Sequence, residues 1–473
     1  MKKYKKLKLT IIGPVLFAFC YFFLPATLFP TVAARAAVGT VAWMAFWWIT
    51  APVGFAVTAF LPIALNALFG MTNMSNVISS YSSETIMLLL GASILTISWE
   101  ETGLDYRIAA KFFAFIGSNF RKQILFWFFL SAALSSILPN AVVCATITPI
   151  AVSMLKYIGE DNISKSRVGS MILLTIAYAA GVGGLASPLG GAMNLVTVDY
   201  LEQLTGMEYM YTSWVIRFLP IMIVLIISNI IMLLAGIKKD EEIGDSREFF
   251  EEKIKTLPPM SMQEKLSFAL FVIATVLAFS RQLYQDVLPG LKPAYVFIIC
   301  AIISFFIPNE EGERIIQWKE AQMYIEWELM YVFAGGLAAG ALINNSGAAA
   351  NIGDAVANMN IYGDFMLIVI IIVMTVIMSD ITSNTATAAV AMPIVISIVQ
   401  GMGRNPIPYV YIASIGVNLS YMLPTSIRAI PVGYGLEPKF MLRKGVPITV
   451  VVIALMSGIS YLLLRFWPAF STI

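Results

Sequence analysis

A short polar run inside an apolar stretch has the side chains needed to bind a carboxylate. Ser383, Asn384 and Thr385 supply two hydroxyls and an amide without net charge, and a helix that starts after them would add partial positive charge. A matching run in the first half of the chain keeps the amide and lacks both hydroxyls. Its residues are Pro139, Asn140 and Ala141. The two runs therefore predict a pair of unequal half-sites.

Arg428 is a basic residue inside a second interrupted apolar stretch. A buried guanidinium is costly unless it pairs with an anion or lines a wet cavity, and its five donors match a carboxylate. Two other interpretations stay open: an ion pair with Asp380 or Glu437, or snorkelling to the cytoplasmic interface. Asp380 can coordinate a cation, or it can sit at the outer mouth near water.

Other residue types that often carry chemistry have simpler interpretations here. Glu84 and Glu328 are expected at helix starts, where a carboxylate favours the helix dipole. The three cysteines, Cys20, Cys144 and Cys300, lie in apolar runs without metal-ligand spacing, which favours a packing role. Histidine is absent, so the usual ligand for zinc, iron or haem is missing.

The elements that hold these residues must span a membrane. Of the 473 residues 59% are hydrophobic and 12% charged, and the mean hydropathy is +0.82, which excludes a soluble globule. Unbroken apolar runs such as 221–237 predict helices and exclude the alternation of a barrel. The lysines at positions 2, 3, 5, 6 and 8 resemble the start of a signal peptide. However, 10–30 is long enough to span and has no convincing cleavage site, so we interpret it as the first helix.

Two apolar runs are too long for one crossing, and each has a polar break near its middle. These runs, 124–157 and 364–400, predict re-entrant hairpins. The expected fold is an all-α integral membrane protein with eleven transmembrane helices plus the two hairpins. The distribution of Lys and Arg places the N-terminus in the cytoplasm. The loops expected on the same side are 103–123, 156–168, 238–263, 309–325 and 438–445.

Residues around the two hairpins repeat at a constant separation of 244, as between Asn140 and Asn384. The other matched pairs are Glu84 and Glu328, Gly91 and Gly335, Gly103 and Gly347, Ala145 and Ala389, Pro149 and Pro393, and Ile150 and Ile394. Five crossings separate the copies, so they would lie in opposite orientations, as in secondary transporters. A further polar break follows each hairpin, at 186–194 and at 423–431.

These observations give one expected organisation of the chain. It consists of N-terminal scaffold helices at 1–83, a first inverted repeat at 84–237 (hairpin 124–157, broken helix 170–200), a cytoplasmic linker at 238–263, scaffold helices at 264–325, and a second inverted repeat at 326–473 (hairpin 364–400, broken helix 407–436, last helix 446–469). Prolines and glycines that merely kink packed helices are the alternative for each break. Four breaks, placed symmetrically in the two halves, favour instead a polar substrate that binds at membrane depth.

The run from Ser383 to Ala389, followed by Met392-Pro393-Ile394, resembles the second Ser-Asn-Thr motif of the divalent anion/sodium symporter family. The run from Glu84 to Gly103 is similar to the family's helix before the first hairpin. The resemblance covers most of 38–470 and implies a homodimer whose transport domain moves as an elevator. It also implies that dicarboxylates bind at the hairpin tips. The expected substrate-binding residues are Asn140, Ala141, Ser187, Pro188, Ser383, Asn384, Thr385, Ser426 and Arg428.

The chain departs from that family where sodium would bind. The first tip has lost its hydroxyls, the first loop keeps only Asn194, and the second loop carries Arg428 where family members are uncharged. Sodium needs oxygen ligands, so the loss of these hydroxyls weakens a sodium site. The guanidinium of Arg428, a cation fixed to the protein, can take the place of the mobile sodium ion. Arg428, Asn194 and Asp380 are the candidates for a cation site or its substitute. We therefore expect a sodium-independent dicarboxylate antiporter without cofactors or other metals, and sodium-coupled di- or tricarboxylate symport is the alternative.

Other function classes lack their sequence features. An enzyme would need a nucleophile and base, a metal cluster or a cofactor loop, and we find none. A channel also uses polar groups near the midplane but does not need an inverted pair of hairpins. The expected partners are succinate, malate, fumarate or 2-oxoglutarate, the lipid bilayer of the inner (plasma) membrane and a second copy of the chain, with no nucleic acid.

Overall fold

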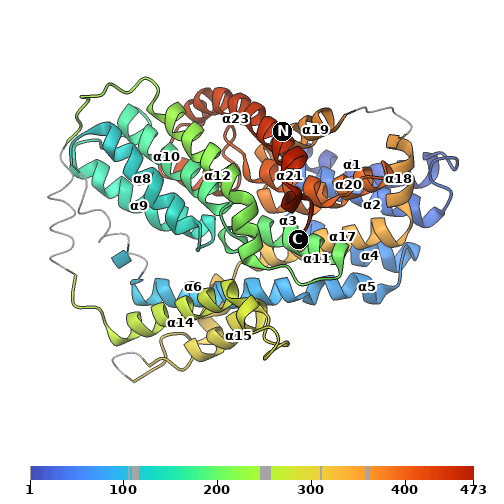
Figure 1. Cartoon of the computed structure of the whole chain (residues 1–473), viewed down its shortest axis with the longest axis horizontal. Helices are drawn as coiled ribbons and strands as arrows, with labels where there is room; N and C mark the ends of the chain where they lie inside the picture. Colours follow the sequence, from blue (N-terminus) through green and yellow to red (C-terminus); the bar gives the residue numbers. More distant parts are fainter. Residues whose placement is uncertain (1, 105–106, 109–116, 245–256, 309–311, 358–362) are drawn as a thin grey trace.

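The computed structural model describes residues 2–104, 107–108, 117–244, 257–308, 312–357 and 363–473, and the named elements in these ranges are helices (Figure 1). Ten of the described helices are long and apolar enough to cross a membrane. The expectation of an all-helical membrane protein with many spans is confirmed. The arrangement of eleven spans with two re-entrant hairpins stays a prediction.

The N-terminal part forms a group of helices at one end of the molecule, from which its last helix, α6, extends across toward the other end (Figure 1). It consists of α1 (Lys2–Phe23), α2 (Val32–Thr50), α3 (Phe55–Ala59), α4 (Leu61–Phe69), α5 (Met74–Ser79), the short 3-10 helix η1 (Ser80–Ser82) and the long α6 (Glu84–Thr102). The apolar run 54–69 forms two short helices, α3 and α4. It is divided at Phe60 because Pro62 follows in the next turn and cannot donate a helical hydrogen bond.

The next group begins with two antiparallel helices joined by a tight break, and α10 packs against both of them (Figure 1). Its elements are α8 (Phe120–Ser135), α9 (Asn140–Tyr157), α10 (Arg167–Gly184), η2 (Pro188–Gly190), α11 (Ala192–Thr205) and α12 (Tyr211–Leu234). Close approach of α8 and α10 depends on Gly183, because a Cβ there would lie 2.2 Å from the Ala132 carbonyl oxygen. Trp127, Phe128 and Trp214 fill the core of this group and are fully buried.

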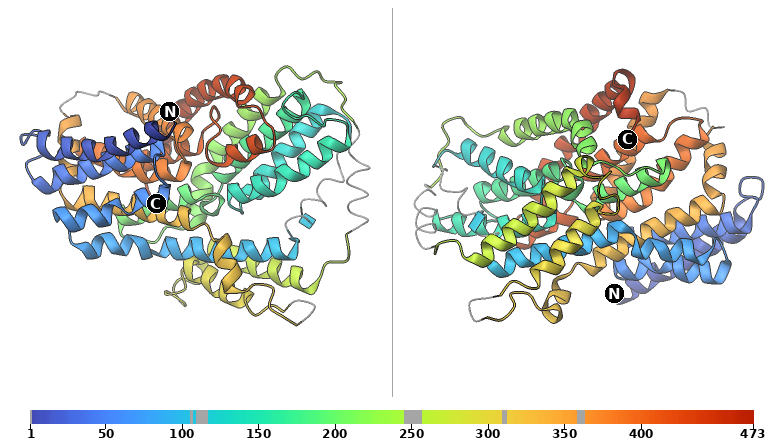
Figure 2. Two further views of the ribbon diagram at one scale, coloured as in Figure 1. Left: turned by 180° about the vertical axis from the view of Figure 1, so that it is seen from behind. Right: turned by 60° about the horizontal axis from the view of Figure 1, so that its bottom comes forward.

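The middle part of the chain packs along α6 mainly through α14 and α15, as both views in Figure 2 show. Its elements are α14 (Met262–Phe279), η3 (Arg281–Leu283), α15 (Pro293–Ser304), α16 (Trp318–Tyr324), α17 (Trp327–Asn345) and α18 (Ala348–Ala357). The last group packs on α17 and α18 through α20. It consists of α19 (Asp364–Ile381), α20 (Asn384–Gly401), α21 (Ile407–Asn418), η4 (Ser426–Arg428), α22 (Ala429–Gly433), α23 (Pro438–Phe466) and η5 (Pro468–Ser471).

Helix starts in the two halves keep the separation found in the sequence. The paired helices α8 and α19 start at 120 and 364, and α9 and α20 start at 140 and 384. Gly103 and Gly347, which follow α6 and α17, both adopt left-handed backbone, with φ of 71° and 82°. The bounds of the expected domains and their inverted orientation stay predictions.

One expected loop, 438–445, differs from the structure. Residues 438–445 were expected to be a cytoplasmic loop, but α23 already begins at Pro438, a residue suited to the first turn of a helix. The described start of the linker, 238–244, is largely exposed, and two contacts tie it to the helix starts at 120 and 167. Phe120 donates its backbone N–H to Glu241 (2.9 Å), and Arg167 pairs with the Glu241 carboxylate (2.7 Å). The linker residues 245–256 lie outside the described ranges.

Candidate functional site

The second hairpin turns at Thr382 and Ser383, where the backbone becomes extended between α19 and α20. Ser383 caps α20, because its side chain accepts a hydrogen bond from the Ala386 N–H (3.1 Å). Asn384 begins α20 and is 2% exposed. Its side-chain oxygen accepts hydrogen bonds from Ser379 (2.9 Å) and Ser420 (3.1 Å), whereas its Nδ2 has no partner.

The second interrupted helix unwinds between Asn418 and η4, and Asp380 holds the unwound segment. The Asp380 Oδ1 atom accepts hydrogen bonds from the backbone N–H groups of Met422 (2.9 Å) and Leu423 (3.3 Å). Thr425 donates its hydroxyl to the Asp380 carbonyl oxygen (3.0 Å). Asp380 is 1% exposed and its Oδ2 has no partner, so it does not lie at a wet outer mouth in this conformation.

Arg428 lies at the end of this segment and is 1% exposed, so it does not snorkel to the surface. Its Nη2 donates to the Ser420 hydroxyl, which in turn donates to Asn384. Nε and Nη1 have no partner. The Asp380 carboxylate attracts the guanidinium electrostatically, but the ion pairs within 4.0 Å in the described residues do not join Arg428 to Asp380 or to Glu437.

The first hairpin turns between Ser135 and Asn140, with Pro139 preceding α9. Asn140 is 7% exposed and packs against the chain at the first break. The packing is close: a Cβ added to Gly184, just before the break, would lie 3.4 Å from the Asn140 Nδ2. Ser187 in the break donates its hydroxyl to the Ser136 carbonyl oxygen (2.5 Å). The first tip and the first break are therefore in direct contact, as the tip and break of the second half are.

Asn194 fills the first break with its amide. It is fully buried, and its Nδ2 donates to the carbonyl oxygens of Gly184 (2.6 Å) and Ser187 (2.8 Å). Asn418, at the end of α21, donates to the Asn194 Oδ1 atom (2.9 Å). This contact joins the first break to the second. A further contact between the halves runs from the Tyr178 hydroxyl to the Tyr421 carbonyl oxygen (2.6 Å).

The remaining expected residues lie at the hairpin tips and at the breaks. Ala141 follows Asn140 in α9, Pro188 starts η2 and is buried, and Thr385 follows Asn384 and is 6% exposed. Ser426 starts η4 with a φ of 51°, left-handed backbone that is rare outside glycine. Ser379, Asn418 and Ser420 also belong to this cluster and were not predicted from the sequence. Their polar side chains inside apolar runs were the available signal.

Glu84 and Glu328 do lie at helix starts, and the structure adds partners for both. Glu84 accepts hydrogen bonds from Lys292 (2.9 and 3.0 Å), and Glu328 accepts one from the Phe55 N–H (2.8 Å). Both carboxylates therefore join segments far apart in the sequence. Neither belongs to the buried polar cluster at the breaks.

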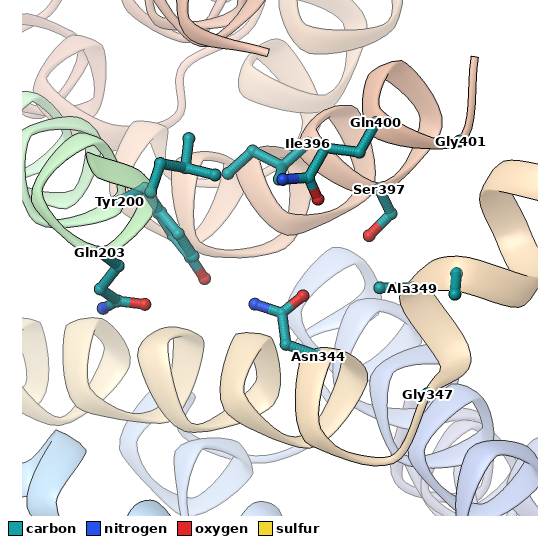
Figure 3. Close-up of a pocket in the computed structure, with 11 residues that line it drawn as sticks. Tyr200, Gln203, Asn344, Gly347, Ala349, Ile396, Ser397, Gln400 and Gly401 are labelled. Carbon is teal, nitrogen blue, oxygen red and sulfur yellow. The ribbon is translucent and has the colours of Figure 1, made fainter. Parts of the chain in front are cut away.

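The large cavity in Figure 3 does not coincide with the predicted residues. It holds about 590 Å³ and is bordered by α11, α17, α18 and α20, with uncharged polar side chains pointing into it. These side chains belong to Tyr200, Gln203, Asn344, Ser397 and Gln400. Ser397 lies 13 residues beyond Asn384 on α20, which is roughly 20 Å at the rise of a helix. A smaller cavity of about 100 Å³ reaches the first tip at Pro139.

Comparisons with known proteins agree with a carrier of carboxylates. A family model described as citrate transporter, CitMHS, matches residues 45–416. The sodium-dependent dicarboxylate transporter SdcS of Staphylococcus aureus (strain USA300) is 28% identical over 441 residues, which cover 90% of this chain and 84% of that protein. This similarity confirms the coarse part of the resemblance to divalent anion/sodium symporters, and the exchanger branch stays a prediction.

A solved structure shows a related fold. The crystal structure of the Alcanivorax borkumensis YdaH transporter matches with a TM-score of 0.56 at 12% identity, over 83% of this chain and 88% of that one. At this identity the likeness concerns the fold alone. Because the family model spans well over half of the sequence, the chain belongs to the citrate transporter family, CitMHS, and is a secondary carboxylate transporter rather than an enzyme.

Proposed function

We propose that the chain transports dicarboxylates of the succinate, malate, fumarate and 2-oxoglutarate class, which bind where the two hairpin tips meet the two unwound segments. The observation that carries this proposal is the second half-site, where Arg428 and Asn384 are buried and still have free N–H donors. Buried donors without partners are costly, and a carboxylate satisfies them. Asn140, Ala141, Ser187 and Pro188 contribute the first half-site.

Sodium-coupled symport is the first candidate for the coupling. The name of the relative SdcS supports it, and so does the charge of the site. Arg428 and Asp380 are both buried at the second break and carry opposite formal charges, so together they add no net charge to the site. This pair therefore does not neutralise the negative charge of a bound dicarboxylate. A sodium ion bound with the substrate would lower the free energy needed to move that charge across the membrane.

Sodium-independent antiport is the second candidate, and the first break favours it. The carbonyl oxygens of Gly184 and Ser187 are ligands of the kind sodium needs, but the Asn194 amide already donates to both. If Arg428 takes the place of a second sodium ion, its positive charge stays in the site when the substrate leaves. The empty carrier then reorients poorly, so a dicarboxylate must be bound on each crossing, which is exchange. In either mode the proposal includes an elevator movement, inverted repeats, a homodimer and a plasma membrane location with the N-terminus in the cytoplasm.

Transport into proteoliposomes separates the two candidates. Labelled succinate or 2-oxoglutarate is offered outside, with sodium or choline, to vesicles that are empty or loaded with unlabelled dicarboxylate. Symport predicts sodium-dependent uptake into empty vesicles. Antiport predicts uptake that requires internal dicarboxylate and ignores sodium. Absence of uptake under all four conditions, from protein that is monodisperse in detergent, would contradict dicarboxylate transport itself.

A further inference from the structure

Three side chains around the second break are almost completely buried and still have polar atoms without partners. Arg428 and Asp380 are each 1% exposed, and Asn384 is 2% exposed. The atoms without partners are the Nε and Nη1 of Arg428, the Nδ2 of Asn384 and the Oδ2 of Asp380. Buried polar groups are nearly always paired, so a site with four such atoms indicates a missing ligand.

Each of the three side chains is held in place by its other polar atoms. Asn384 uses its Oδ1 for Ser379 and Ser420, and Arg428 uses its Nη2 for Ser420. The Oδ1 of Asp380 accepts two backbone N–H groups of the unwound segment. The atoms that remain free are therefore donors on Arg428 and Asn384 and one acceptor on Asp380.

We propose that this half-site selects carboxylates that carry a hydroxyl group beside the carboxylate, and that Asp380 is the residue that determines this specificity. The ligand's carboxylate accepts hydrogen bonds from Arg428 and Asn384, and its hydroxyl donates one to the Asp380 Oδ2. Malate fits this description and succinate does not. The inference rests on the proposed dicarboxylate transport and deepens it by naming the preferred subclass.

The charge of the site favours a hydroxyl over an ammonium group as the donor. An amino dicarboxylate such as aspartate would also satisfy Asp380, but it would bring a positive charge into the same buried space as the Arg428 guanidinium. Like charges repel strongly where water does not screen them. The expected order of affinity is therefore malate first, then succinate and aspartate.

The first test uses the unaltered protein and three matched ligands. Malate, succinate and 2-methoxysuccinate share two carboxylates, but of the three only malate has the hydroxyl donor. Competition against labelled malate uptake should show at least about a tenfold preference for malate over both analogues, the size of one hydrogen bond to a charged group. Citrate and tricarballylate, its analogue without the hydroxyl, form a second pair for binding by thermal shift. Malate and 2-methoxysuccinate competing within about twofold of each other would overturn the inference.

The second test changes the acceptor. Asp380→Asn keeps an oxygen for the Met422 and Leu423 N–H groups and replaces the free acceptor with an NH₂ donor. The ratio of malate to succinate affinity, read from competition and independent of the total uptake, should therefore fall to about one. The matched control is Asp364→Asn on the same helix, where the carboxylate pairs with Arg404 (2.8 Å) instead. It should keep the preference for malate. An unchanged preference in Asp380→Asn would also overturn the inference.

The outcomes separate this inference from the proposed function. If succinate is transported and the hydroxyl makes no difference, dicarboxylate transport stands and the role of Asp380 falls. If neither malate nor succinate is transported, both fall. If Asp380→Asn does not yield folded protein, the comparison of malate with 2-methoxysuccinate on the unaltered protein decides.

Discussion

Asn140 and Asn384 each begin the second helix of a hairpin, but their surroundings differ in charge and in how completely they are paired. In the first half-site, Asn194 bridges the carbonyl oxygens of the break and is itself held by Asn418. In the second, Arg428 and Asp380 bring opposite charges into a buried space and both have free atoms. Satisfied polar groups rigidify a site, and unsatisfied ones leave it open for a ligand. We therefore propose that the first half-site serves mainly as a brace, and that the second makes the stronger contacts with the substrate.

Removal of the Arg428 side chain should have the largest effect. Arg428→Ala removes at least two charge-assisted hydrogen bonds to the substrate, which corresponds to a fall in uptake of about a hundredfold or more. It also leaves the buried Asp380 carboxylate without an opposite charge at the second break, which should lower stability. Uptake into proteoliposomes and thermal melting in detergent measure the two effects.

Two related variants control this experiment. Arg428→Lys keeps the charge and should restore stability better than uptake, because an ammonium lacks the planar donors of a guanidinium. Arg404→Ala removes an arginine near the far end of α20, half-exposed and paired with Asp364, and should change uptake little. Uptake by Arg428→Ala at the level of the unaltered protein would contradict the assignment of the second half-site as the main cargo contact.

Substitutions of the two asparagines at the hairpin tips should have the next largest effects on uptake, and the two effects should differ. Asn384→Ala removes a free donor and also the acceptor that orients Ser420, on which Arg428 depends. We expect uptake to fall about tenfold or more. Asn140→Ala should lower uptake only about threefold, because Asn194 holds the first break together without it. Equal losses in the two variants, or a larger loss in Asn140→Ala, would show that the first half-site binds cargo as strongly as the second.

The brace in the first half-site can be removed directly. Asn194→Ala leaves the carbonyl oxygens of Gly184 and Ser187 without this donor, at a cost of about 1–3 kcal/mol in stability. Because these oxygens then suit a hard cation, sodium should raise the melting temperature of the variant more than that of the unaltered protein, with choline as the reference salt. Asn66→Ala removes another buried amide, outside both half-sites, and should melt earlier without responding to sodium. The same sodium response in Asn66→Ala would contradict this interpretation.

Features that depend on neighbouring residues could be predicted from the sequence, whereas features that depend on contacts between distant residues could not. The sequence predicts breaks at 139–141 and 383–385, because Pro, Ser and Asn in an apolar run have local effects on the backbone. The helices α9 and α20 begin inside these runs, at Asn140 and Asn384, whereas the second helix was expected to start after Thr385. The second break was expected from Leu423, but the helix already ends at Asn418. That difference arises from Asp380, which lies 42 residues before Met422 and captures its N–H. Such contacts depend on the folded arrangement of α19 and α21 and leave no periodic trace in the sequence.

The smallest effect is expected from a charged pair outside both half-sites, and it sets the baseline for the others. Lys292 donates to the Glu84 carboxylate at 2.9 and 3.0 Å, but the two side chains are 37% and 43% exposed. Water screens such a pair, so Lys292→Met should change stability by less than about 1 kcal/mol and leave succinate uptake unaltered. Melting and uptake are measured beside Arg428→Ala. A loss of uptake in Lys292→Met comparable to that in Arg428→Ala would mean that removing any cation impairs the carrier, and the contrast between the half-sites would then no longer explain the role of Arg428.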